Sequence, residues 1–203
     1  MLLSELVLSA LTDVILACVL FFLAGLSLRP GIQTFSPAWI WSLTLALIGL
    51  ASMLGAIDHG FFETIGHEAH RPLVITTRIV IVLGSFSMIV AASFQYLSSP
   101  LRQGFVAAGV LGALWPVFMI LTSDDFLSVI LYYSAGLIFL LVLSVVRFRQ
   151  NKGTLPMIAG ILLTLGVSAM IPMQSPGFWG LGLYGSYHVL LMPIVVPCEV
   201  AVE

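Results

Sequence analysis

Long runs of apolar residues, separated by short polar breaks, constrain the fold of this chain more than any other feature. Residues 14–28, VILACVLFFLAGLSL, contain no charge. A helix needs about 20 apolar residues to cross the hydrocarbon core of a bilayer. Only 8% of the chain is charged and 60% is hydrophobic, whereas a soluble domain carries about 25% charged residues. The sequence therefore predicts one integral membrane domain over residues 1–203, surrounded by membrane lipids.

Turn-forming breaks divide these apolar runs into seven predicted helices. Arg29-Pro30-Gly31 and Ser98-Ser99-Pro100 are two such breaks. The runs do not alternate polar and apolar residues as the strands of a membrane barrel would, so we predict an all-α bundle. A different pairing of the fourth and fifth runs would reduce the count to six. The predicted spans are residues 4–28, 39–62, 73–97, 103–122, 126–147, 154–172 and 178–199.

The basic residues predict how the bundle is oriented. Cytoplasmic loops carry an excess of Lys and Arg, and here the basic residues gather in the first, third and fifth loops. The N-terminus is therefore predicted outside and the C-terminus inside, in a plasma or inner membrane. The chain has no basic patch of the kind that binds nucleic acid. The basic residues of those three loops are Arg29, Arg102, Arg147, Arg149 and Lys152.

Residues 55–72, GAIDHGFFETIGHEAHRP, hold three of the four histidines of the chain. A helix continuing to Pro72 would place His59, Glu63, His67 and His70 within about 80° of one another, at spacings i, i+4, i+8 and i+11. Imidazole and carboxylate are ligands for zinc and several other divalent metals. The alternative for His67 and His70 is a solvated helix end, where water begins.

Two further ionisable residues lie deep inside predicted spans. Asp13 and His188 are each about 13–15 Å from the outer end of their helices. A charge at the bilayer centre costs about 2.5–3.5 kcal/mol, so Asp13 needs a partner, which His188, His59 or Arg78 can supply. Tyr184 lies one turn before His188 and can hydrogen-bond the same site, although it equally fits an interfacial aromatic belt.

These groups predict a metal site in the outer half of the bundle. The expected ligands are His59, His188 and Asp13, with Asp58 as the alternative carboxylate. Asp13, Asp58 and Glu63 are the candidate catalytic carboxylates. A divalent metal, with zinc as the first candidate, would activate water to hydrolyse a lipid-like substrate. A polar clasp that only joins helices is the structural alternative.

A seven-helix chain with its N-terminus outside and histidines on its second and seventh helices resembles the superfamily of alkaline ceramidases and adiponectin receptors. The resemblance implies a zinc-dependent hydrolase within the membrane, with His59 and His188 at two of the ligand positions of that family. Three positions depart from the family pattern: Gly55 replaces a serine, Arg78 is the ionisable residue of the third helix in place of an aspartate, and Met192 replaces a histidine.

Two other classes of function stay open at this point. Chains of Asp and His within membranes commonly carry protons, and His titrates near neutral pH, so a proton or metal transporter or a sensor is one alternative. A small accessory subunit is the other. It would bind another membrane protein, or a haem with His59 and His188 as axial ligands.

Overall fold

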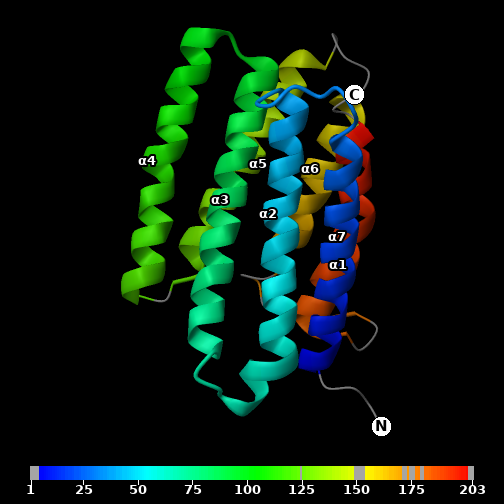
Figure 1. Cartoon of the computed structure of the whole chain (residues 1–203), viewed down its shortest axis with the longest axis vertical. Coiled ribbons are helices and arrows are strands. Elements are labelled where there is room, and N and C mark those ends of the chain that lie inside the picture. The colour runs from blue at the N-terminus through cyan, green and yellow to red at the C-terminus, as the bar shows by residue number, and fades with distance from the viewer. Residues whose placement is uncertain are drawn as a thin grey trace.

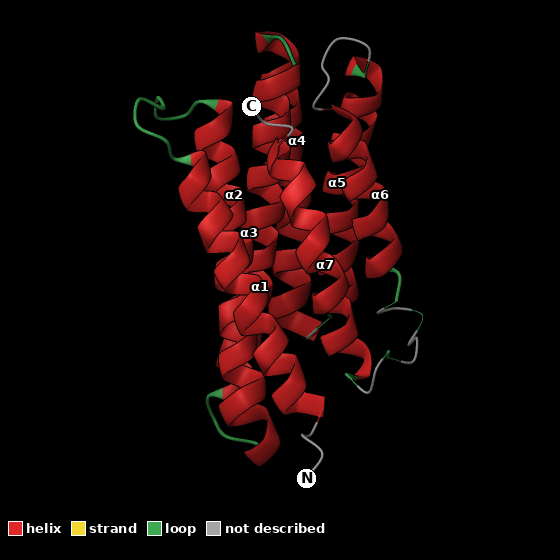
Figure 2. Ribbon diagram, turned by 90° about the vertical axis from the view of Figure 1, so that its right-hand side faces the viewer, coloured by secondary structure: helices red, strands yellow, loops and turns green. Residues whose placement is uncertain are grey.

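The computed structural model describes residues 5–123, 125–148, 154–170, 173, 177–178 and 181–200; the side chains of residues 64, 184 and 193–200 lie outside this description. All regular secondary structure in this part of the chain is helical (Figure 2). This confirms the predicted all-α fold class.

Seven α-helices correspond one to one to the predicted spans over the described ranges. Helices α1 to α5 are long and apolar enough to cross a membrane. The largest difference from the predicted bounds is in α2, which ends at Ile57, five residues earlier than expected. The orientation of the bundle in a membrane stays a prediction. The helices are α1 (Glu5–Ser27), α2 (Pro37–Ile57), α3 (His70–Tyr96), α4 (Ser99–Ser123), α5 (Leu127–Arg147), α6 (Thr154–Ser168) and α7 (Gly182–Val200).

Six of these helices form a closed ring. Each helix contacts the next in the order α1, α2, α3, α5, α6, α7, and α7 contacts α1. Helix α4 packs outside the ring against α3 and α5 and forms one edge of the molecule (Figure 1). The first and last helices of the chain are therefore neighbours, although the sequence separates them by more than a hundred residues.

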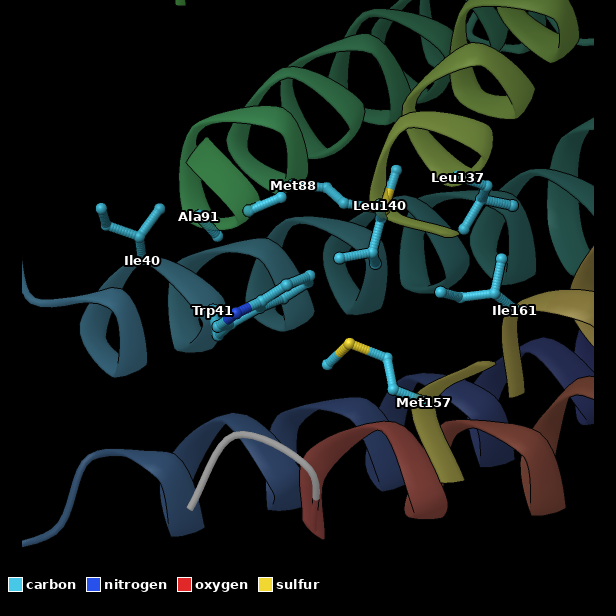
Figure 3. Close-up of a cluster of buried hydrophobic side chains, with 9 residues drawn as sticks. Ile40, Trp41, Met88, Ala91, Leu137, Leu140, Met157 and Ile161 are labelled. Atoms are coloured by element: carbon cyan, nitrogen blue, oxygen red, sulfur yellow. The ribbon is translucent and has the colours of Figure 1, made fainter. Parts of the chain in front are cut away.

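An apolar core fills the half of the ring that contains the start of α2 and the end of α3. Trp41 of α2, Leu140 of α5 and Met157 of α6 are buried together there (Figure 3). The indole Nε1 of Trp41 donates a hydrogen bond to Oε1 of Gln95 at 2.8 Å. Because this half is filled by apolar side chains, the ionisable side chains collect in the opposite half.

The connection between α2 and α3 is not the single helix considered from the sequence. A π-helical turn, η1 (Asp58–Phe62), and a 3-10 turn, η2 (Glu63–Ile65), follow α2. Gly66 then adopts a left-handed conformation with φ +59°, a backbone state that commonly ends helices and favours glycine. The chain reverses here, so the expectation of one continuous polar stripe from His59 to His70 is wrong.

Candidate functional site

A cavity of about 590 Å³ opens in the half of the bundle near η1 and η2. Its volume lies in the range of small-molecule sites in proteins. Side chains from all six helices of the ring and from both irregular turns line it. Eight of its lining residues carry a carboxylate, an imidazole or a guanidinium group: Asp13, Asp58, His59, Glu63, His70, Arg71, Arg78 and His188.

The deepest ionisable pair joins α1 to α7. Nε2 of His188 lies 3.2 Å from Oδ1 of Asp13, and the two side chains are 12% and 5% exposed. The hydroxyl of Thr12 lies 3.4 Å from Nδ1 of His188. His188 is thus the partner that the sequence required for Asp13.

Gly55 of α2 makes room for this pair. A Cβ atom added at Gly55 would lie 3.3 Å from Oδ2 of Asp13, which is closer than ordinary van der Waals contact. The carboxylate therefore lies directly against the α2 backbone. The sequence identified Gly55 only as a departure from a family pattern, because the contact with Asp13 is made across two helices.

A second pair lies within the irregular turns. Nδ1 of His59 and Oε2 of Glu63 are 2.5 Å apart, and their side chains are partly exposed. Asp58, the preceding residue, is buried and forms a third pair with His70 at the start of α3, with 2.8 Å between its Oδ1 and Nδ1 of His70. Isolated π turns are frequent at functional sites, and here the π turn brings Asp58 and His59 to one cavity.

Asp58, His59 and Glu63 can together hold a metal ion. Each offers one ligand atom, and these atoms lie within 4.8 Å of one another. Ligand atoms of a tetrahedral zinc site with bonds of about 2.0–2.2 Å lie about 3.3–3.6 Å apart, so the most widely separated of these atoms would have to move closer by about 1 Å to bind one ion. His70 orients the Asp58 carboxylate, as the hydrogen-bonded neighbours of metal ligands commonly do.

The other predicted site residues fall in different places. His67 is exposed and does not line the cavity, and its Nδ1 accepts a hydrogen bond from the backbone N–H of Ala69. Arg78 lines the cavity, with its guanidinium carbon 5.4 Å from the centre of the Phe126 ring. The side chain of Tyr184 lies outside the described residues.

The three predicted ligands His59, His188 and Asp13 all line the cavity. Asp13 is paired with His188, whereas His59 is paired with Glu63. Whether these three bind one ion stays a prediction. Sequence reasoning missed Arg71 and Thr77 as cavity residues. The spacing of seven residues between Arg71 and Arg78 was the available signal for Arg71, since residues three, four and seven apart share one helix face.

Comparisons with known proteins identify the chain only at the level of its family. Residues 8–202 match the model of a family described as "Family of unknown function (DUF6962)". Neither a curated protein nor a solved structure matches the chain.

Proposed function

The chain belongs to this family of unknown function, and from the geometry of its cavity we propose that it is an integral membrane hydrolase with a divalent-metal site. The observation that carries the proposal is the set of three imidazole–carboxylate pairs lining one cavity, formed by Asp13 with His188, His59 with Glu63, and Asp58 with His70.

Membrane insertion is supported by the outer surface of the bundle. Bulky apolar side chains stay exposed there, including Phe22 at 66%, Leu111 at 68% and Val146 at 70%. Large exposed apolar surfaces mark contact with lipid or with another protein, and α1 to α5 are long enough to cross a membrane. We place the N-terminus outside and the C-terminus inside, so that the cavity opens on the outer side of a plasma or inner membrane.

A purely structural clasp explains the pairs poorly. Hydrogen bonds between membrane helices contribute about 0.6 kcal/mol on average, which is less than the cost of about 2.5–3.5 kcal/mol for one charged residue at the centre of a membrane helix. The His59–Glu63 pair lies within one continuous stretch of irregular helix, and the Asp58–His70 pair closes the short connection that leads from η1 to the start of α3. Only Asp13–His188 joins two separate helices of the ring.

The proposed chemistry is hydrolysis of the bond between a carbonyl carbon and a heteroatom in a lipid-like substrate. Asp58, His59 and Glu63 would hold the metal, with zinc as the first candidate, and the metal would supply polarisation of the carbonyl and a lowered pKa of water. Hydroxide bonds to the carbonyl carbon, the bond to the leaving group breaks, and the leaving group takes a proton. The Asp13–His188 pair takes up the proton from water and returns it to the leaving group.

Metal analysis of the purified protein tests the proposal. Wild type in detergent is expected to contain about one divalent metal per chain, and His59→Ala is expected to lose it. His67→Ala is the matched control, because it removes the same side chain from the same connection but outside the cavity, and it should keep the metal. Wild type without bound metal, or His59→Ala with unchanged metal, would overturn the proposal.

His188→Ala separates the two possible ligand sets. If Asp58, His59 and Glu63 hold the metal, His188→Ala keeps it and loses hydrolysis of lipid-like esters or amides. Loss of the metal in His188→Ala would instead support the set of His59, His188 and Asp13. An absorption spectrum of the same sample detects haem, and a Soret band would favour the accessory-subunit alternative.

Proton transport is a second candidate because a smaller cavity lies next to the first. This cavity of about 120 Å³ shares the side chains of Ile48 and Tyr133 with the larger one, and Thr44 and Thr164 are among its polar lining residues. Asp and His side chains linked to such a path can relay protons. Proton flux into liposomes that contain the purified protein, abolished by Asp13→Asn, would support transport.

A further inference from the structure

One face of α3 turns toward the cavity and carries two guanidinium groups. Arg71, Val74, Thr77, Arg78 and Ile81 all line the cavity, and their spacing of three to four residues places them on one helix face. Arg71 and Arg78 are two helical turns apart, about 10 Å along the axis. We call this set of five residues the α3 wall.

The polar groups of the α3 wall are one hydroxyl and two guanidiniums in different surroundings. The hydroxyl oxygen of Thr77 is buried and has no hydrogen-bond partner among the described residues, which is costly for a polar group unless something else satisfies it. The guanidinium of the next residue, Arg78, lies over the ring of Phe126. Its positive charge also helps to lower the pKa of Asp125, two residues before α5. Arg71 is exposed at the edge of the cavity.

The charges of the cavity also favour an anion, once the proposed function is accepted. Counted as formal charges with neutral histidines, three carboxylates and two guanidiniums give the cavity one net negative charge. A divalent metal at the proposed site converts this to one net positive charge. A monoanionic ligand would neutralise the occupied cavity. The charged residues counted are Asp13, Asp58, Glu63, Arg71 and Arg78.

Helices α1, α5 and α7 add apolar side chains to the lining of the cavity. Val129 and Ile130 of α5 line it, together with Leu16 of α1 and Leu191 of α7. Hydrocarbon buried against such side chains contributes about 25 cal/mol for each Å² removed from water. A ligand that satisfies both the α3 wall and these side chains must combine an anionic group with a hydrocarbon part.

We propose that the α3 wall binds the phosphate or carboxylate group of an anionic amphiphile, and that this amphiphile is the substrate class of the proposed hydrolase. Guanidinium groups match the oxygen geometry of phosphate and carboxylate and form paired hydrogen bonds with them. The hydroxyl of Thr77 donates a further hydrogen bond to the same anion. The apolar residues of α1, α5 and α7 hold the hydrocarbon next to the metal and to the Asp13–His188 pair.

Binding of defined probes to the full-length protein in detergent tests this assignment. Dodecyl phosphate is the anionic amphiphile, dodecanol is the neutral probe with the same chain, and inorganic phosphate is the free anion. Dodecyl phosphate should bind at least about tenfold more tightly than either of the others, because neither of them satisfies both parts of the cavity. Equal affinity for dodecanol would overturn the anion site, and equal affinity for inorganic phosphate would overturn the amphiphile.

Arginine variants localise the site. Arg71→Gln and Arg78→Gln should each weaken dodecyl phosphate binding by about tenfold or more. Arg71 is exposed, so its replacement leaves the fold intact, and Arg78→Lys keeps the charge while removing the planar fork. Arg102→Gln on α4 is the control, because Arg102 does not line the cavity. Unchanged affinity in both Arg71→Gln and Arg78→Gln would overturn the proposal.

Metal content distinguishes failure of this inference from failure of the proposed function. If dodecyl phosphate binds through the arginines while the protein contains no metal, the anion site stands and the hydrolase assignment falls. If metal binds at His59 but the arginine variants bind dodecyl phosphate as wild type does, the anion site falls and the metal site stands.

Discussion

Replacing Asp13 and His188 by leucine, singly and together, measures how strongly their contact joins the two ends of the chain. Leucine keeps the branching at Cγ of both residues while removing their polar atoms. The contact of 3.2 Å between Oδ1 and Nε2 lies among side chains that are only 5% and 12% exposed. Water therefore competes weakly for either partner.

The expected coupling free energy follows from this geometry. Hydrogen bonds between membrane helices couple by about 0.6 kcal/mol on average and about 1.7 kcal/mol at most, and a well-buried ionisable pair belongs in the upper half of that range. We therefore expect about 1 kcal/mol. Each single variant should lose about 1–3 kcal/mol, because the remaining partner stays buried while the atom that faced the replaced side chain loses its hydrogen bond. The double variant should recover part of that loss, since no orphaned group remains.

Reversible unfolding in mixed detergent micelles, followed by far-ultraviolet circular dichroism, gives the free energy of unfolding of the four proteins. The coupling is the difference between the double variant and the sum of the two single variants. Additive single effects, with coupling below about 0.3 kcal/mol, would refute the claim that this pair links α1 to α7.

Two further predictions concern α2 and the start of α5. Gly55→Ala places a Cβ atom 3.3 Å from Oδ2 of Asp13, whereas alanine favours the helix by about 1 kcal/mol. The variant should therefore stay folded but lose hydrolysis. Gly25→Ala, with no atom within 4 Å of the added Cβ, is the control and should keep hydrolysis. Asp125 lies outside the spans, and the hydrogen bond from the backbone N–H of Ser128 lowers its pKa below the ordinary 3.8. Its stabilising effect is therefore complete above that ordinary pKa and is lost as the pH falls through the lowered value. The melting temperatures of wild type and Asp125→Ala should converge in acid, and a constant difference from neutral pH to about pH 3 would contradict this.

The helices of this protein could be predicted because they depend on local sequence. A run of about 20 apolar residues can satisfy its backbone in lipid only by forming a helix, and turn-forming residues such as Pro30 and Gly31 end the runs. The need of Asp13 for a partner was also local information, since it follows from the cost of a charge in a membrane.

The identity of each partner depended on the tertiary structure. Asp13 meets His188 because ring closure places α1 beside α7, and no sequence periodicity reports that contact. Gly66 turns the chain back, so that His70 returns to Asp58 while His67 stays exposed. Hydrophobicity acts on each segment separately, whereas side-chain pairing depends on which faces of distant helices meet. The sequence therefore determined the helices, and packing decided which ionisable groups share a cavity.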